Sequence, residues 1–282
     1  TTILGDVARQ VVGDHGRVEV LMPVGADPHS FQASAAQAAS LRGADLVVVN
    51  GAGLEGGLHD VVAAAAAEGV AVVEAASFVV LLSLDHEGED REHEGEGEER
   101  DDHDSLDPHI WTDPSRMAEV ATGLGEALAA ARPACATAYR AAAAAYAGEL
   151  LGLDAEIEAT LAAVPPEQRK LLTNHHALGY FADRYGFEVI GAIIPGGATL
   201  AEPSAADLAG LVDLLRRAGV RAIFAETTRP AGLAEALAAE LGGRVAVVSL
   251  YTGSLGEPGS GADTYPGMQR TNAERIAAAL VP

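Results

Sequence analysis

An acidic segment divides this chain and limits what can fold around it. Residues 85–107 contain thirteen Asp or Glu, two Arg and three His, which gives a net charge of −11 out of −23 for the whole chain. Leu106 is the only aliphatic residue among them. Such a segment has almost no apolar surface whose burial could offset the entropy lost on ordering. We therefore expect a disordered acidic loop at about residues 85–106, between two folded stretches.

The end of this segment is also the start of a structured one. Residues 107–111 read Asp-Pro-His-Ile-Trp and include Trp111, the single tryptophan of the chain. We interpret the acidic loop, which bears His86, His93 and His103, as an accessory that collects metal ions for a buried site at His109. A disordered tether cannot preorganise a tight coordination geometry, so we expect it to assist capture or transfer rather than to set the final affinity.

The bulk composition excludes several classes of function. A net charge of −23 argues against nucleic acid, whose binding requires neutralised phosphates, and against an anionic membrane surface. Cys135 is the only cysteine, which excludes a thiolate zinc finger, an iron–sulfur cluster and a disulfide framework. Any metal must therefore be bound by histidine and carboxylate. No apolar run reaches the ~18–20 residues of a transmembrane helix.

The hydrophobic pattern alternates between helices and strands on both sides of the acidic loop. We expect helices at residues 2–13, 34–42, 54–68, 176–185, 204–218, 231–241 and 265–280. We expect strands at residues 17–23, 45–50, 70–74, 170–173, 189–194, 221–225 and 245–250. Such alternation favours parallel sheets flanked by helices.

The two α/β stretches are separated by a long helical region. An Ala-rich pattern runs almost without interruption from Pro114 to Val164, and its second part, about residues 134–163, predicts one long rigid helix. The predicted fold class is therefore α/β, with two (βα)-type domains joined by one long linker helix. We place the N-terminal domain at residues 1–132, the linker helix at 133–164 and the C-terminal domain at 165–282.

A glycine-rich turn raises the alternative of a nucleotide-binding enzyme. Gly51-Ala-Gly53-Leu-Glu-Gly56 follows a predicted strand and opens a predicted helix, which is the context of a dinucleotide-binding fingerprint. However, Glu55 places a carboxylate where a pyrophosphate would bind, and no Lys or Arg lies nearby in the sequence. We favour a simple strand-to-helix turn.

Histidines follow several predicted strands at their carboxyl ends. His29 lies in one Asp-Pro-His motif, His109 lies in a second, and His175 and His176 follow the strand at residues 170–173. Loops at the carboxyl ends of parallel strands converge, and ligands bind there. In each motif the proline restricts the chain, and the aspartate can orient the neighbouring backbone. One such histidine is usually just solvated, but a set of them favours a metal site.

A fourth ligand is expected if the metal is zinc, which prefers tetrahedral coordination. Asp263, just before the last predicted helix, is the best candidate, although an aspartate there is also a common helix N-cap. Glu226 ends a strand and is the rival carboxylate, for which we favour a supporting or salt-bridging role. Three histidines and one carboxylate leave no open position for catalysis, so we expect binding and release. A zinc-dependent hydrolase using the same residues stays as an alternative.

Motifs along the whole chain resemble one known family. They are Ile3-Leu-Gly-Asp6, Gly25-Ala-Asp-Pro-His-Ser-Phe31, Gly43-Ala-Asp-Leu-Val-Val-Val-Asn-Gly51, Leu54-Glu55, Asp107-Pro-His-Ile-Trp-Thr-Asp-Pro114, Asn174-His-His-Ala-Leu-Gly-Tyr-Phe181 and Tyr265-Pro-Gly-Met-Gln-Arg-Thr-Asn272. The chain resembles the zinc- and manganese-specific solute-binding proteins of bacterial ABC importers, the cluster A-I or ZnuA-like group. The Asp-Pro-His motif directly after an acidic, His-bearing insertion is similar to that of the zinc members.

This resemblance implies a site and a biological setting. It implies a metal ion in the cleft between two domains, with His29, His109, His175 and Asp263 as ligands, while His176 falls where the family often has Asp. It also implies a further strand just before Thr1. Three imidazoles favour Zn²⁺ over Mn²⁺, which prefers oxygen ligands, and a manganese-binding homologue is the alternative.

The resemblance also implies where the protein acts and with what. We expect a monomeric periplasmic protein, with its signal peptide removed, that delivers zinc to an ABC-transporter membrane permease. A periplasmic zinc chaperone is a further candidate partner. No enzymatic activity and no contact with nucleic acid are expected.

Overall fold

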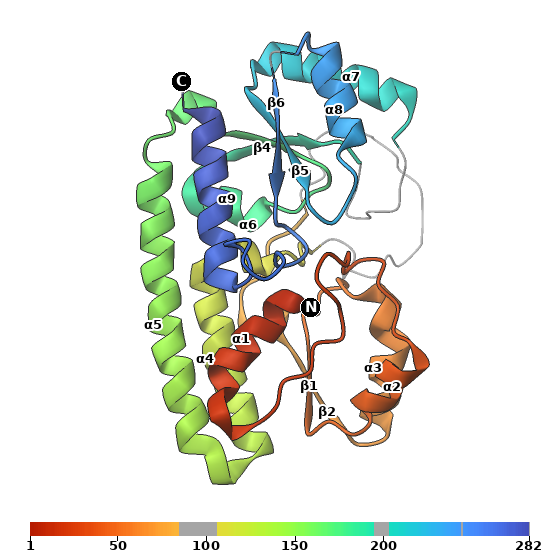
Figure 1. Cartoon of the computed structure of the whole chain (residues 1–282), viewed down its shortest axis with the longest axis vertical. Helices are drawn as coiled ribbons and strands as arrows, with labels where there is room; N and C mark the ends of the chain where they lie inside the picture. The colour runs from red at the N-terminus through yellow and green to blue at the C-terminus, as the bar shows by residue number, and fades with distance from the viewer. Residues whose placement is uncertain (85–105, 195–202, 244, 282) are drawn as a thin grey trace, which may run out of the picture.

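Two α/β lobes lie beside a set of long helices in the computed structural model of this chain (Figure 1). The structure describes residues 1–84, 106–194, 203–243 and 245–281. The acidic loop with His86, His93 and His103 lies outside the described residues. None of the helices in these ranges is both long and apolar enough to cross a membrane.

The N-terminal lobe is built on a small parallel sheet. Its elements are α1 (Thr2–Val12), α2 (Ala35–Leu41), β1 (Leu46–Val49), α3 (His59–Ala67) and β2 (Ala71–Glu74). The two strands pair in parallel, with Leu46 opposite Ala71. The predicted apolar face of α1, formed by Ile3, Val7 and Val11, is buried. These elements confirm the predicted βαβ pattern of this half.

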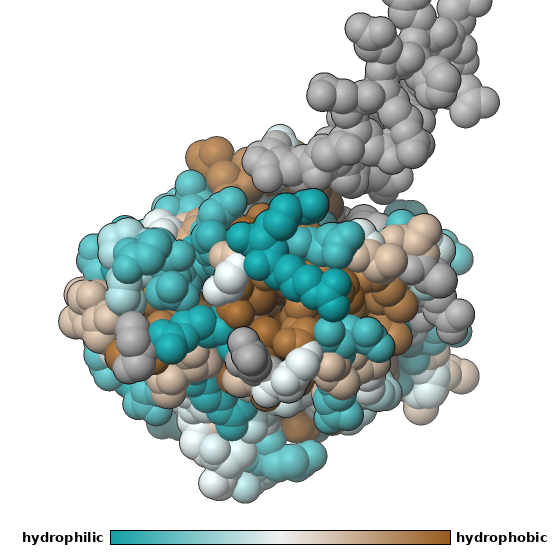
Figure 2. Space-filling view, turned by 90° about the horizontal axis from the view of Figure 1, so that it is seen from above, coloured by the Kyte–Doolittle hydropathy of each residue, from teal (hydrophilic) through white to brown (hydrophobic). Residues whose placement is uncertain are grey.

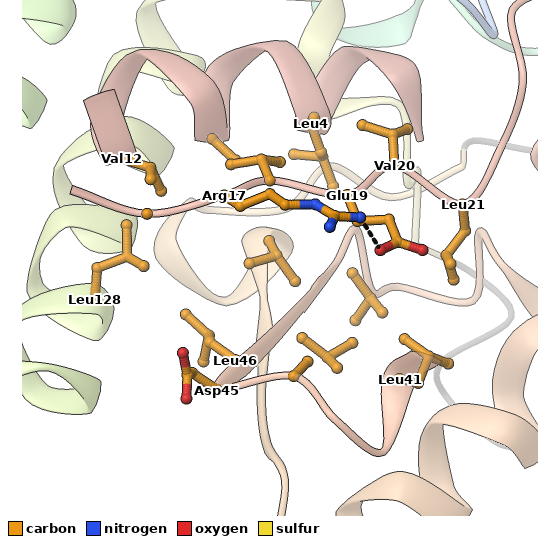
Figure 3. A pocket seen from close by; sticks show the side chains of 18 of the residues that line it. Leu4, Val12, Arg17, Glu19, Val20, Leu21, Leu41, Asp45, Leu46 and Leu128 are labelled. Atoms are coloured by element: carbon orange, nitrogen blue, oxygen red, sulfur yellow. Dashed lines mark hydrogen bonds and ion pairs between the residues drawn. The ribbon is translucent and has the colours of Figure 1, made fainter. Parts of the chain in front are cut away.

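The predicted strand at residues 17–23 is wrong. This segment forms no strand and pairs with neither β1 nor β2. A cavity of about 440 Å³ is lined by residues of both this segment and β1, among them Leu21 and Leu46, whereas Val20 points toward α1 (Figure 3). The residue types favoured an extended strand, but a strand also needs a neighbour within hydrogen-bonding distance.

Two long helices connect the lobes. Asp113 caps α4 (Pro114–Ala131), and its side chain accepts hydrogen bonds from the backbone of Ser115 and Arg116. The next helix, α5 (Ala136–Leu161), has 26 residues and is therefore about 39 Å long. It packs against α1 and α4 from the N-terminal half and α9 from the C-terminal half. The expected long helix is confirmed, with a short 3-10 turn at Pro133–Cys135 before it.

The C-terminal lobe has a four-stranded sheet in the order β4-β3-β5-β6, and all neighbours are parallel. Its elements are β3 (Lys170–Thr173), α6 (Gly179–Tyr185), β4 (Glu188–Ala192), α7 (Ala205–Ala218), β5 (Ala222–Glu226), α8 (Gly232–Glu240), β6 (Ala246–Leu250) and α9 (Tyr265–Leu280). Further 3-10 turns lie at Gly13–His15, Gly56–Leu58, Ala75–Phe78, Ile110–Thr112 and Pro166–Gln168. The predicted α/β class with parallel sheets is confirmed.

One hydrophobic core runs through both lobes. It joins Ile3 and Leu54 of the N-terminal lobe to Phe224 and Tyr265 of the C-terminal lobe, with Trp111 between them. Away from this core, α7 and α8 leave a hydrophobic hollow with a hydrophilic rim, seen from above in Figure 2. The shared core fixes how the two lobes meet, and therefore how loops from each approach the other.

Candidate metal centre

Three histidine rings meet between the lobes. His29 comes from a loop of the N-terminal lobe, His109 from the segment before α4, and His175 from the carboxyl end of β3. Their candidate ligand atoms all lie within 4.8 Å of one another. The Nε2 atom of His109 is 3.1 Å from Nε2 of His29 and 3.0 Å from Nε2 of His175. The three predicted histidines are thus brought together, each by its Nε2 atom.

His109 is held by the aspartate of its own motif. One oxygen of Asp107 accepts hydrogen bonds from the backbone nitrogen of His109, at 2.9 Å, and from its ring Nδ1, at 2.7 Å. An ionised carboxylate only accepts, so Nδ1 carries the proton and Nε2 presents its lone pair to the centre. The aspartate was expected to orient the backbone; it orients the ring as well.

The His109 segment is anchored by both lobes. Asn50, at the end of β1, donates its side-chain amide to the carbonyl of Pro108 at 2.8 Å. From the other lobe, the hydroxyl of Tyr180 donates to the carbonyl of Asp107 at 2.7 Å. The indole of Trp111 donates to the carbonyl of Thr252 at 2.7 Å. His109 is therefore fixed at the point where the lobes meet.

His175 is oriented by a carboxylate from a different strand. Its Nδ1 donates to Glu226, which ends β5, and both side chains are only 3% exposed. Burial by itself raises the pKa of Glu226, but the hydrogen bond with His175 and the nearby His175 and His109 rings together lower it below its usual value. The carboxylate therefore stays ionised, and the Nε2 lone pair of His175 faces His109.

The spacing of the Nε2 atoms fits a tetrahedral metal ion. Zinc–nitrogen bonds of ~2.0–2.1 Å in a tetrahedron place two ligand nitrogens about 3.3 Å apart. The separations from His109 to His29 and to His175 are 3.1 and 3.0 Å. His109 and His175 also direct lone pairs at each other, an arrangement that a cation between them would stabilise.

His29 lies closer to solvent than the other two rings. Its backbone nitrogen donates to Asp27 at 3.0 Å. Burial is the main cause that lowers the pKa of His29 to about 2, and the neighbouring His109 and His175 rings and the charge of Arg229 act in the same direction. The ring is therefore neutral at ordinary pH and can bind a metal without first losing a proton.

Asp263 does not join the three histidines. It is exposed, and its carboxylate accepts a hydrogen bond from the backbone nitrogen of Gly259 at 2.8 Å, which closes a turn on the surface. Nor is Asp263 the N-cap of α9: that residue is Thr264, whose side chain accepts a hydrogen bond from the backbone nitrogen of Gly267. Among the described residues no carboxylate reaches the group of ligand atoms. The position of Asp263 just before α9 does not determine whether its side chain points toward the cleft or toward solvent.

The geometry also bears on His176 and on Glu55. His176 lies outside the cluster, so His175 is the member of the pair that faces the centre. Glu55 is buried and accepts hydrogen bonds from the backbone nitrogens of Asn50, at 2.8 Å, and Gly51, at 3.3 Å. Its carboxylate therefore occupies the donors that a pyrophosphate would need, as the sequence suggested.

Sequence reasoning missed Arg229, which lies beside this site. Its guanidinium is 3.4 Å from the carboxylate of Asp27, from which it is separated by 202 residues. No local motif indicates a contact over such a distance in sequence. Gly179 was also missed: a Cβ there would lie 2.3 Å from the carboxylate of Asp107, so this glycine leaves room for it.

Comparisons with known proteins agree with the geometry. The model of a family described as "Zinc-uptake complex component A periplasmic" matches residues 1–279. The chain is 32% identical to the manganese-binding lipoprotein MntA of Bacillus subtilis, in an alignment of 286 positions that covers 99% of this chain and 88% of the relative. It is 31% identical to the zinc-binding protein TroA of Treponema pallidum, in an alignment of 286 positions that covers 99% of this chain and 87% of the relative.

A solved structure shows the same fold. The periplasmic zinc-binding protein TroA from Treponema pallidum superposes with a TM-score of 0.85 at 28% identity, over 100% of this chain and 97% of that chain. The likeness therefore covers both lobes and the long helices between them.

Proposed function

The chain belongs to the periplasmic family of zinc-uptake component A, and we propose that it captures Zn²⁺ between its lobes and delivers it to the membrane permease of an ABC importer. The family consists of metal-binding proteins that serve uptake and are not enzymes. One observation carries the proposal: the rings of His29, His109 and His175 converge on one point, and a carboxylate orients the rings of His109 and His175.

His29, His109 and His175 are the proposed zinc ligands. Their Nε2 separations support this assignment, and so does the carboxylate behind each of His109 and His175. Such carboxylates fix the ring and increase the basicity of the coordinating nitrogen. We assign the fourth tetrahedral position to a solvent molecule instead of Asp263. Catalytic zinc sites also keep such a position, so the zinc-dependent hydrolase is set aside because the chain belongs to a family of uptake proteins, and not because the site is closed.

Zinc is the preferred metal, and manganese is the second candidate. An all-imidazole donor set suits zinc, whereas manganese favours carboxylate and water oxygens. The second candidate follows from the relatives, since MntA of Bacillus subtilis is named for manganese and TroA of Treponema pallidum for zinc. The donor chemistry at this site supports the zinc assignment.

The acidic loop is proposed to assist the main site. His86, His93 and His103 stand among thirteen carboxylates, and weak contacts with zinc there would raise its local concentration. The proposed route runs from this loop to His109, which begins the structured segment directly after it. Affinity is assigned to the three-histidine centre.

Competition titration of chelator-stripped protein tests the function. We expect one tight equivalent of zinc and much weaker binding of manganese, both measured against a chelator of known affinity for each metal. Elemental analysis of the loaded protein gives the stoichiometry. Tighter binding of manganese than zinc would support the second candidate, and no tight equivalent of either would contradict the proposal.

A further inference from the structure

The loop that carries His29 has no regular structure of its own to hold it. Residues 22–33 contain turns but no helix or strand. The ring nevertheless lies 3.1 Å from His109. The turns of the loop supply some backbone hydrogen bonds, and Gly57 of the same lobe lies against Phe31. Further contacts come from the opposite lobe.

Two contacts, one of the backbone and one of a proline ring, join this loop to the C-terminal lobe. The backbone nitrogen of Gly25 donates to the hydroxyl of Ser254 at 2.9 Å. Pro28 lies against Gly253, where an added Cβ would be 3.1 Å from Cδ of the proline. Both partners follow β6 in the chain, so the loop rests on the end of that strand.

The contact nearest to His29 is an ion pair. One oxygen of Asp27 accepts from the backbone nitrogen of His29 at 3.0 Å, and the other accepts from the hydroxyl of Ser30 at 3.2 Å. This second oxygen also lies 3.4 Å from the guanidinium of Arg229. Asp27 thus connects the backbone of the proposed ligand directly to the C-terminal lobe.

Arg229 is well placed to act as an anchor. It follows Glu226, the partner of His175, by three residues, and its backbone nitrogen is 3.5 Å from the carbonyl of Glu226. The side chains of Arg229 and Asp27 are 24% and 13% exposed. A pair with this degree of burial is screened less than one on the open surface.

We propose that Arg229 is a positioning residue, whose ion pair with Asp27 latches the His29 loop to the C-terminal lobe and slows the release of bound metal. This inference rests on the proposed function, since it concerns the same site. Arg229 touches no metal ligand atom in this role; it acts through Asp27 and the backbone of His29.

Two effects of Arg229 have opposite signs, which makes the role testable. Its positive charge lies beside the proposed site and repels a cation bound there. If that repulsion were its only effect, replacing Arg229 by a neutral residue would slow metal release. If the latch dominates, the same replacement speeds release.

The experiment compares zinc release from wild type, Arg229→Gln and Arg229→Lys. Each protein is loaded with one equivalent of zinc and mixed rapidly with excess chelator. The latch predicts release about two- to fivefold faster from Arg229→Gln, with Arg229→Lys between it and wild type. The ratio falls toward one as salt is raised, because salt screens the ion pair. Arg216→Gln is the matched control, since Arg216 pairs with Asp213 within α7, and its release rate should equal that of wild type.

A second measurement needs no metal. Hydrogen exchange in the metal-free proteins should be faster for the amides of residues 27–31 in Arg229→Gln than in wild type or Arg216→Gln. The double variant Asp27→Asn/Arg229→Gln should release zinc no faster than the more affected single variant. The reason is that each replacement breaks the same ion pair, so the two effects do not add.

The outcomes separate this inference from the proposed function. Release from Arg229→Gln that is equal to or slower than wild type overturns the latch while the zinc function stands. If wild type retains no zinc, the proposed function fails, and the exchange of residues 27–31 still decides the latch: unchanged exchange in Arg229→Gln overturns it.

Discussion

The two Asp-Pro-His motifs have the same sequence and different surroundings. In both, the aspartate accepts a hydrogen bond from the backbone nitrogen of the histidine, at 3.0 Å for Asp27 and 2.9 Å for Asp107. Asp107 also binds the ring of His109, whereas Asp27 directs its other oxygen toward Arg229 across the lobe boundary. The motif sets the backbone, and the position in the fold decides what the rest of the carboxylate does.

The difference teaches where rigidity comes from in this centre. Asp107 is only 3% exposed, its carbonyl is held by Tyr180, and Gly179 leaves space for its carboxylate. Asp27 lies on a loop that depends on contacts with the other lobe. We therefore regard His109 and His175 as the preformed part of the site and His29 as the part that closes it.

The largest expected effect is the loss of a preformed ligand. His109→Ala should weaken zinc binding by about 10³-fold or more, since it removes a ligand and leaves Asp107 buried without its ring partner. His29→Ala should have a smaller effect, about 10²-fold, because two oriented imidazoles remain. Competition titration measures both. His176→Ala is the control and should bind as wild type; an equal loss in all three variants would contradict the comparison.

Loss of an orienting carboxylate should come next. Asp107→Asn and Glu226→Gln keep the size of each side chain but weaken the hold on the ring Nδ1, and each should reduce zinc affinity about 10–100-fold. Asp27→Asn should cost less, since Asp27 contacts the backbone of His29, whereas Asp107 and Glu226 contact a ring nitrogen. Competition titration with zinc measures the loss of affinity in each variant, and circular dichroism checks that each is folded. A larger loss of affinity in Asp27→Asn than in Asp107→Asn or Glu226→Gln would contradict this order.

Acid should destabilise the metal-free protein through His29. Its pKa of about 2 in the folded state lies below the value of 6.5 expected when unfolded, so the unfolded chain binds the proton first as pH falls. Protonation of His29 in the unfolded chain therefore lowers the free energy of unfolding as pH decreases from 6.5 toward 2, by about 1–2 kcal/mol at pH 5. Denaturant unfolding of wild type and His29→Gln at pH 7 and pH 5 measures it. Equal pH dependence in both proteins would show that the His29 ring is solvated.

The smallest effect on affinity is expected from the acidic loop. Deleting residues 86–104 should leave the tight zinc equivalent within about twofold, because the proposed ligands all lie outside the loop. The weak additional equivalents provided by His86, His93 and His103 should disappear. Calorimetry distinguishes the two classes, and loss of the tight equivalent would make the loop a source of ligands.

Much of the fold was accessible from sequence because hydrophobic periodicity reports burial directly. The four strands of the C-terminal lobe and the long helix α5 lie close to their predicted ranges. Residues 17–23 have the composition of a strand and are not one, because pairing depends on what lies alongside. Amino-acid composition shows that a segment favours an extended backbone, but a β-strand also needs a neighbouring strand to pair with.

The site was only partly accessible from sequence. His29 and His109 could be found from the repeated Asp-Pro-His motif, and His175 from its place after β3, where loops converge. The strand predicted before His29 does not form, so the prediction that His29 follows a strand was wrong. The direction of Asp263 and the contact of Arg229 with Asp27 could not be found from sequence, because both depend on how separate loops pack in three dimensions. Glu226 was recognised as a suitable carboxylate, but only the structure places it behind His175.

The coordination shell of bound zinc tests the central claim most directly. X-ray absorption at the zinc edge of protein loaded with one equivalent should show three imidazole nitrogens at ~2.0–2.1 Å and one light oxygen ligand from solvent. Asp263→Ala should give the same spectrum. A shell with fewer than three imidazoles, or one that changes in Asp263→Ala, would contradict the three-histidine centre.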